Sequence, residues 1–208
     1  MRPEELLDIL DRAARLKTTY RHCYTEGERR ESVADHSWRI ALMAMLISRE
    51  PEFADADMDK VIRMCLIHDL GESFTGDVPT FLKTKGDSDK EDDIFRLWVA
   101  SFPEAQSREW TELLAEMEAL ETREAKIYKA LDRIEALISH NESDLETWEP
   151  LEYDLQYTYG KENVKFSEYL TALRNAVDDQ TTEKLKREGS GFFGFKNKAG
   201  IGGEGAGE

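Results

Sequence analysis

The sequence predicts a single all-α domain, a bundle of helices around a central site. Three observations lead to this prediction. Apolar residues recur with the period of about 3.6 that is typical of helices, and no stretch of any length alternates as a strand does. The chain has 208 residues and no linker in its middle, which suits one domain with a sizeable core. Its composition, 40% hydrophobic and 35% charged, fits helices with charged outer faces.

The first two helices are expected before Pro51. Leucine and alanine residues form a helical stripe over residues 4–17, and the polar stretch Thr18–Arg30 is expected to be a loop. Ser32 can then cap a second helix, because Asp35 stands three residues later in a weak version of the capping box. This helix is expected to end before the proline, which cannot continue it.

A third helix is expected over residues 58–70, with Asp57 as its N-terminal cap. Gly71 is expected to break or kink it. The residues that follow, 75–79, have the composition of a turn.

The second half of the chain is expected to be helical apart from two segments. The charged segment 83–93 is expected to be mobile at its start and to lead into a helix end over residues 94–102. Residues 107–140 form one long helix or two in series, with the last histidine, His140, on the helix surface. Glu149–Tyr159 is rich in aromatic residues and is expected to be irregular. Asn163–Lys186 is the final helix.

The composition changes sharply from Gly189 onward, where glycine dominates with scattered phenylalanine. Such a segment cannot bury enough apolar surface to offset the entropy that ordering costs. We therefore expect one domain over residues 1–187 and a disordered, glycine-rich tail over residues 188–208.

The formal net charge is -16, with a pI near 4.8. An acidic surface repels nucleic acid backbones, so a polymeric DNA or RNA partner is not expected. A small phosphorylated substrate stays possible, since a metal and a few basic side chains can reverse the local field. The chain lacks the apolar stretch of a signal peptide and any run long enough to cross a bilayer, so no membrane contact and a cytoplasmic location are expected. The two cysteines, Cys23 and Cys65, form no metal-binding pair.

Four side chains on three predicted helices could meet inside the bundle. His36 and His68 fall on the apolar faces of separate helices, Asp69 follows the second histidine, and Asp132 stands in an apolar stretch of a third helix. Burying these groups without a partner would be costly, and two imidazoles with two carboxylates suit a divalent cation. A lone histidine or aspartate on an inward face is more often a satisfied core residue, so spacing alone leaves both interpretations open.

The neighbourhood of the His-Asp pair is more specific. The run CLIHDLGESFTGDVPT at residues 65–80 closely resembles the HD-domain 5′-deoxynucleotidase family of nucleoside monophosphate phosphohydrolases. ESVADHS at residues 31–37 matches the first-histidine motif of that family, and KALDRIE at residues 129–135 looks like its last-aspartate helix. The resemblance covers roughly residues 16–155 and does not extend to the tail.

This resemblance implies an HD-domain helical bundle with one divalent metal ion, such as Mn, Co, Mg, Fe or Zn. Carried over by position, the metal ligands are His36, His68, Asp69 and Asp132. The family also implies a homodimer, for which the apolar face of residues 107–120 is a candidate surface.

The resemblance also implies four residues that act on the substrate. Glu72 becomes a catalytic carboxylate, and Asp77 a substrate-binding or catalytic one. Arg21 falls where the family places an arginine for the phosphate. His22 stands where the family usually has a tryptophan against the sugar, so deoxyribose selectivity is open and ribonucleotides are possible substrates.

These roles make physical sense for hydrolysis of a phosphomonoester. A metal lowers the pKa of bound water, and the planar guanidinium of Arg21 matches phosphate geometry. Glu72 follows Asp69 by three residues, so on a continuing helix it shares a face with that ligand and can activate water or protonate the leaving group. Asp77, in a turn, could accept a hydrogen bond from a sugar hydroxyl.

The sequence therefore predicts a metal-dependent phosphomonoesterase that hydrolyses (deoxy)ribonucleoside 5′-monophosphates to nucleoside and phosphate. One alternative is an HD-domain hydrolase of another small phosphorylated metabolite. Another is a non-catalytic metal-binding regulatory module, although such a module would not need Glu72. A dinuclear phosphodiesterase or an oxygenase would need further histidines, and only His22 and His140 remain. A helical scaffold without metal is the remaining possibility.

Overall fold

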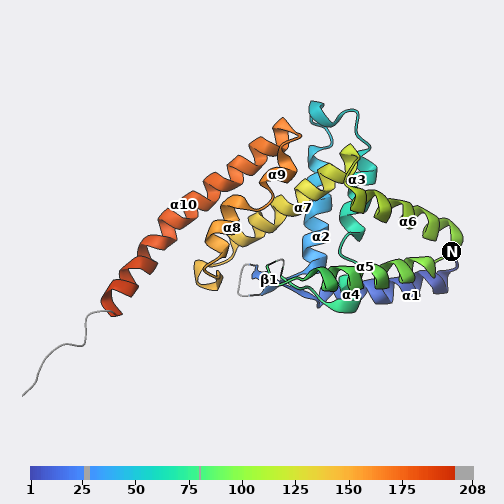
Figure 1. The fold of residues 1–208 in the computed structure, drawn as a ribbon, viewed down its shortest axis with the longest axis horizontal. Coiled ribbons are helices and arrows are strands. Elements are labelled where there is room, and N and C mark those ends of the chain that lie inside the picture. The colour runs from blue at the N-terminus through green and yellow to red at the C-terminus, as the bar shows by residue number, and fades with distance from the viewer. Residues whose placement is uncertain (26–28, 80, 200–208) are drawn as a thin grey trace, which may run out of the picture.

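The computed structural model describes residues 1–25, 29–79 and 81–199, with side chains placed as far as residue 188. It is a helical bundle with one small two-stranded sheet, so the predicted all-α fold is confirmed (Figure 1). The helices in chain order are α1 (Pro3–Ala13), α2 (Val33–Ile47), α3 (Met58–Ile67), α4 (Glu72–Thr75), α5 (Lys85–Ala100), α6 (Glu104–Ala119), α7 (Arg123–Glu142), α8 (Glu152–Thr158), α9 (Lys161–Val164) and α10 (Glu168–Ala199). The 3₁₀ turns are η1 (Ala14–Lys17), η3 (Pro51–Phe53) and η4 (Leu145–Thr147).

Helices α2, α3 and α7 pack against one another at the centre of the molecule (Figure 1). Each contributes side chains that are fully removed from solvent, such as Ile40, Met64 and Leu131. Burying a large apolar side chain contributes about 1.5–3 kcal/mol, so this three-helix contact stabilises the fold substantially. Since the predicted histidines and aspartates lie on these three helices or directly after them, the core also positions the candidate site.

The remaining helices cover this centre. Helices α5 and α6 pack on each other, and α10 packs along α7 before it extends away from the body (Figure 1). The two predicted caps at the central helices are confirmed. The Ser32 side chain accepts from the Asp35 amide in a capping box, and Asp57 accepts from the Lys60 amide.

The prediction of a loop over Thr18–Arg30 is wrong, because strands β1 (Tyr20–Tyr24) and β2 (Arg30–Ser32) pair antiparallel there. The pairing is irregular, with a register shift between its two ends. The buried side chains of β2 are the polar residues Glu31 and Ser32. A strand that buries polar groups shows no apolar alternation, so the usual signal was missing.

Three other expectations about elements need correction. The segment expected to be mobile after residue 83 forms the start of α5, because Thr84 and Asp87 make a capping box. The third helix ends at Ile67, and α4 forms after a turn. Glu149–Tyr159, expected to be irregular, contains α8.

The long segment 107–140 is two helices, separated at Leu120, which adopts a left-handed backbone conformation. The apolar face of residues 107–120 does not form a free surface. Its side chains Leu113 and Met117 are buried in the core of the same chain. This face is therefore not available as the predicted dimer interface.

The final helix α10 continues to Ala199, past the domain boundary predicted at residue 187. No proline stands in residues 168–199 to stop it. The rest of the predicted tail, residues 200–208, lies outside the described residues. Within the described part of the chain, no helix combines the length and the apolar character that spanning a bilayer requires.

Candidate active site

Three helices bring the four predicted metal ligands to one point. His36 comes from α2, His68 and Asp69 directly follow α3, and Asp132 comes from α7. The His36 Nε2 atom lies 3.3 Å from Asp132 Oδ1 and 3.8 Å from Asp69 Oδ2. The His68 Nε2 atom lies 2.9 Å from Asp69 Oδ2 and 3.9 Å from Asp132 Oδ1. The predicted cluster thus exists as a set of converging donor atoms.

The orientation of His68 suits a metal ligand. Its Nδ1–H donates to the carbonyl oxygen of Cys65 at 2.8 Å, which leaves a lone pair on Nε2. This Nε2 atom is buried and makes no hydrogen bond of acceptable geometry with the described residues, although a carboxylate oxygen of Asp69 faces it at 2.9 Å. Two lone pairs at this distance repel each other unless a proton or a cation lies between them. The donor set therefore fits a divalent cation.

Glu135 orients the other imidazole. His36 Nδ1 donates to the Glu135 carboxylate, so Nε2 is the atom that faces the cluster. Burial and Arg21 lower the pKa of His36, but Glu135 and Asp132 outweigh them and raise it to about 9, so Nε2 must release its proton for a cation to bind there. Glu135 is fully buried. Burial raises the pKa of this carboxyl group, but His36, Arg21 and Arg39 outweigh it and lower the pKa to about 2. Sequence reasoning missed this residue, although it follows Asp132 by three positions and thus shares its helix face.

A buried network of charges surrounds Glu135. Arg39 Nε lies 2.6 Å from one Glu135 oxygen, and Arg21 Nη1 lies 3.4 Å from the other. Glu31 belongs to the same network, because Arg21 Nη1 lies 3.5 Å from its carboxylate and the hydroxyl of Ser139 donates to it at 2.5 Å. The predicted phosphate-binding Arg21 therefore stands between two carboxylates at the edge of the cluster.

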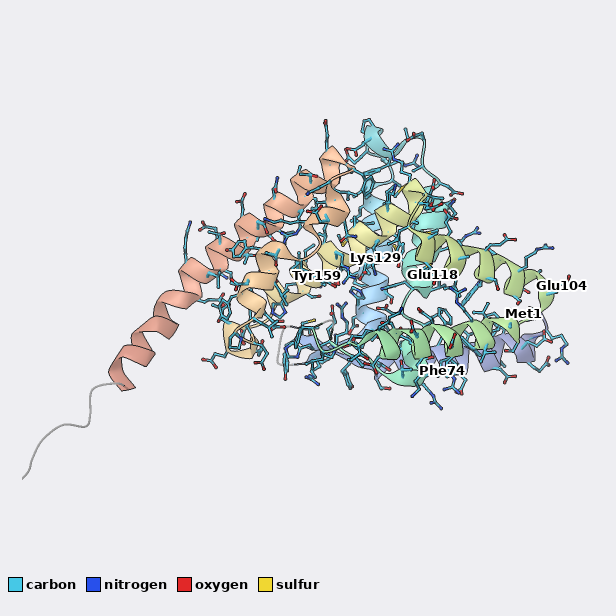
Figure 2. All side chains as sticks on the ribbon, in the orientation of Figure 1. Met1, Phe74, Glu104, Glu118, Lys129 and Tyr159 are labelled. Atoms are coloured by element: carbon cyan, nitrogen blue, oxygen red, sulfur yellow. The ribbon has the colours of Figure 1, made fainter. Side chains whose placement is uncertain are left out.

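The carboxylates of the cluster itself are held ionised. Burial opposes ionisation of Asp69, but His68 and His36 keep its pKa well below the ordinary value. Burial likewise opposes ionisation of Asp132, and its neighbours, with Lys129 first among them, lower its pKa. Lys129 Nζ lies 2.8 Å from Asp132 Oδ2. Figure 2 shows Lys129 near the middle of the molecule, on α7.

Glu72 differs from these carboxylates in its protonation. It begins α4, is buried, and its Oε2 atom has no hydrogen-bond partner among the described residues. Burial, together with the negative charges of Asp69 and Asp77, raises the pKa of Glu72 to about 11. The side chain is therefore protonated at neutral pH and can act as an acid.

Asp77 and Lys83 border the same region. Burial raises the pKa of Asp77, although Arg21 acts in the opposite direction. Lys83 donates to Glu91 at 2.8 Å, and its charge acts on both Glu72 and Asp77. Lys83, first interpreted as part of a mobile loop, is thus tied to α5 beside the predicted catalytic carboxylates.

A pocket of about 120 Å³ adjoins the cluster. Arg21 and Asp77 line it, so it is continuous with the site described above. Its further walls come from β1, the segment before α5, α7 and α8, through His22, Cys23, Pro79, Phe81, Ala136, Leu137, His140, Glu152, Leu155, Gln156 and Tyr159. Figure 2 shows Tyr159 at the end of α8, beside α7.

His140 lies in this pocket and is buried, so the expectation that it is a surface residue is wrong. The segment after α7 folds back over it, and Trp148 packs on its ring with the centroids 4.4 Å apart. Its Nε2 atom lies 3.3 Å from Glu152 Oε2, and His22 Nε2 lies 3.3 Å from Glu152 Oε1. Sequence reasoning missed Glu152, because nothing in the local pattern of α8 marks a site.

Comparison with known proteins agrees with this geometry. A family model described as HD domain matches residues 13–174. The 5′-deoxynucleotidase HDDC2 of Homo sapiens is 32% identical over 146 residues, which are 68% of this chain and 70% of that protein.

Two solved structures share the fold. A predicted metal-dependent phosphohydrolase from Magnetospirillum magnetotacticum superposes with a TM-score of 0.73 at 29% identity, over 87% of this chain and 95% of that one. The HD phosphohydrolase DatZ of cyanophage S-2L, bound to dA and one catalytic Zn²⁺ ion, superposes with a TM-score of 0.55 at 22% identity, over 85% of this chain and 96% of that one. The second likeness concerns the fold alone.

Proposed function

Because the chain belongs to the HD-domain family, we propose that it is a metal-dependent phosphohydrolase of (deoxy)ribonucleoside 5′-monophosphates. The observation that carries this proposal is the meeting of two imidazoles and two carboxylates from three helices, with the buried Glu72 at the start of α4, three residues after Asp69. The human relative, a 5′-deoxynucleotidase, supports the substrate class.

We assign one divalent cation (Mn, Co, Mg, Fe or Zn) to His36, His68, Asp69 and Asp132. The donor atoms of His36, His68 and Asp69 lie within 4.8 Å of one another, and Asp132 Oδ1 lies 3.3 Å from His36 Nε2, which supports this assignment. When bound, the cation supplies Lewis acidity toward the phosphoryl oxygens and lowers the pKa of water. Glu135 acts through His36, whose tautomer it fixes by accepting the Nδ1 proton.

Glu72 is the proton donor in this proposal. Hydrolysis of a phosphomonoester leaves an alkoxide, which needs a proton as the bond to phosphorus breaks. The Glu72 carboxyl group is protonated at neutral pH and its Oε2 atom is unpartnered, so it can donate to that oxygen. A dication bound beside Glu72 would lower this pKa and so ease transfer of the proton near neutral pH.

Arg21 and Asp77 contact the substrate in this proposal. The ion pairs of Arg21 with Glu31 and Glu135 both use Nη1, so we assign Nη2 to a phosphate oxygen. Asp77 lines the pocket next to Arg21 and is positioned to accept a hydrogen bond from the sugar.

We also expect a cytoplasmic homodimer with no nucleic acid polymer as partner. The negative net charge supports the last point. For the dimer, α2 offers an apolar strip that differs from the surface predicted first. Its side chains Trp38, Met45 and Leu46 are 62%, 54% and 65% exposed. Light scattering of the purified protein measures the oligomeric state.

Phosphate release tests the proposed function. The protein is stripped of metal with a chelator, reloaded with each candidate cation, and assayed on ribo- and deoxyribonucleoside 5′-monophosphates. We expect Asp69→Ala to lose both metal and activity. Glu72→Gln should keep its metal and lose about 10²- to 10⁴-fold in kcat, the usual contribution of a general acid.

Asp93→Asn is the matched control, because this carboxylate is exposed on α5 and should leave activity unchanged. Absence of phosphate release from every monophosphate, with metal bound stoichiometrically, would overturn the proposed function. Full activity of Glu72→Gln would remove Glu72 from its role.

A further inference from the structure

Glu152 lies between two histidines in the wall of the pocket. Its side chain is buried, and its two carboxylate oxygens face different imidazoles. The Oε1 atom lies 3.3 Å from His22 Nε2, and the Oε2 atom lies 3.3 Å from His140 Nε2. The three side chains come from α8, β1 and α7, so the arrangement depends on the tertiary fold.

The position of Glu152 is fixed by its surroundings. The backbone amide of Glu149 donates to Glu152 Oε2 at 2.6 Å. Trp148 packs on His140, and the ring of Phe81 meets His22 edge-on with the centroids 5.6 Å apart. A carboxylate held by a backbone amide between two packed rings is preorganised, which lowers the entropic cost of binding a ligand.

The two histidines beside Glu152 each have a side-chain nitrogen that lacks a hydrogen bond. The Nε2 atoms of His22 and His140 are buried, and neither makes a hydrogen bond of acceptable geometry with the described residues despite the short distances to Glu152. Buried polar atoms without partners are costly, so such atoms facing a pocket indicate a ligand that completes them.

A second cation does not fit this place. The two imidazoles approach different oxygens of the Glu152 carboxylate. Among the described residues, two groups of three histidine or acidic side chains bring their donor atoms within 4.8 Å of one another, as a cation would require. Both groups contain His36, and neither contains Glu152. A hydroxyl group fits better, because it can donate to the carboxylate and accept from an imidazole.

Two adjacent hydroxyls match the two oxygens of one carboxylate. In another fold, an acidic side chain binds the 2′-hydroxyl of the ribose of a dinucleotide. Because Arg21 and Asp77 line the same pocket, a phosphate at the cluster and a diol at Glu152 can belong to one molecule. The volume of about 120 Å³ is well below the roughly 300–1,000 Å³ of pockets that enclose a whole ligand, so the pocket suits the sugar and leaves the base outside.

We infer that Glu152, with His22 and His140, binds the 2′- and 3′-hydroxyls of a 5-phosphorylated ribose and makes this chain prefer ribose over deoxyribose. The inference rests on the proposed function and specifies its substrate class. It implies little selection of the base. It also distinguishes this chain from relatives that are 5′-deoxynucleotidases.

The metal-loaded enzyme tests this inference with paired substrates. They are AMP and dAMP, UMP and dUMP, and ribose 5-phosphate and 2-deoxyribose 5-phosphate. We expect kcat/KM to be at least about tenfold higher for the ribose member of a pair, since a site built to bind a hydroxyl rejects the analogue that lacks it. For Glu152→Gln this ratio should fall below about threefold, because the uncharged amide binds hydroxyls more weakly.

His22→Phe is the second variant, because it keeps a ring against Phe81 and removes Nε2, and it should lower the ratio in the same direction. Glu146→Gln is the control, since this exposed carboxylate precedes α8 and lies outside the pocket. Comparison of AMP with ribose 5-phosphate separates a nucleotide from a sugar phosphate as the source of the diol. Circular dichroism confirms that each variant is folded.

A wild-type ratio near or below one would overturn the inference and leave the proposed function standing. A ratio that both variants leave unchanged would overturn it as well. If no monophosphate is hydrolysed, the proposed function fails, and calorimetry then decides the inference separately. In that case equal affinities of the metal-loaded protein for AMP and dAMP would overturn it.

Discussion

The substitution Glu135→Gln tests whether the carboxylate behind His36 supports both the fold and the metal centre. The side chain is fully buried and is hydrogen-bonded to His36 Nδ1. Glutamine keeps its shape and removes its charge. The variant therefore isolates the negative charge that faces His36 and the two guanidinium groups of Arg21 and Arg39.

Two magnitudes follow from these contacts. Breaking a buried ion pair by removing one partner costs about 3–5 kcal/mol, and the amide that remains can still accept a hydrogen bond, so we expect a loss of about 2–3 kcal/mol in the free energy of unfolding. Removing the group that orients a ligating histidine usually weakens metal binding about 10- to 100-fold. That range corresponds to about 1.4–2.7 kcal/mol of binding free energy.

Urea unfolding of the metal-free protein measures the first effect, and competition with a metal chelator measures the second. Glu142→Gln is the matched control. Glu142 bonds the same arginine, Arg39, at 2.6 Å but is half exposed, and exposed ion pairs contribute only about 0–1 kcal/mol. A Glu135→Gln protein with wild-type metal affinity would refute the argument that Glu135 orients His36.

Three further results are expected. The native protein should react slowly with thiol reagents at pH 8, because burial raises the pKa of Cys23 and Cys65 and leaves little reactive thiolate. Rapid labelling of either cysteine before denaturant is added would contradict this. Gly160→Ala should lower Tm by about 2–8 °C, because φ is +73° and a Cβ there would lie 2.7 Å from Arg133 Cβ. Gly86→Ala on α5 should leave Tm unchanged, because a Cβ there meets no close neighbour. Adding metal at 100 times its Kd should stabilise the protein by about 2.7 kcal/mol, and an unchanged unfolding curve would argue against a built site.

Much of the central fold could be predicted from the sequence because its signals are local. The caps at Ser32 and Asp57 each need only a few neighbouring residues, and both are confirmed. The convergence of His36 and His68 followed from their apolar helix faces together with a specific motif. Local patterns do not show what folds over a helix end, which is why His140 was misplaced on the surface.

The parts that sequence analysis missed are polar contacts between segments far apart in the chain. Glu135 bonds His36, and Glu152 approaches His22 across most of the chain length. A charged residue on a helix usually faces solvent, so burial of these carboxylates becomes evident only when the partners from other elements are in place. The hairpin β1–β2 escaped prediction for the same reason, since its buried side chain at Glu31 serves the network around Glu135.

The charge balance of the site argues that metal and phosphate bind cooperatively. Arg21 and Arg39 offset Glu31 and Glu135, Glu72 is protonated, and Lys129 pairs with Asp132, so Asp69 leaves negative charge facing the cluster when the imidazoles are neutral. In a chain of net charge -16, this region repels a phosphate dianion until a cation offsets the two aspartates. Since coupling between two ligands is reciprocal, a nucleotide must raise the affinity for the cation by the same factor as the cation raises the affinity for the nucleotide. Arg21 and Arg39 alone do not offset the charge of the aspartates. Their own charges are already balanced by Glu31 and by Glu135, the residue that accepts the Nδ1 proton of His36.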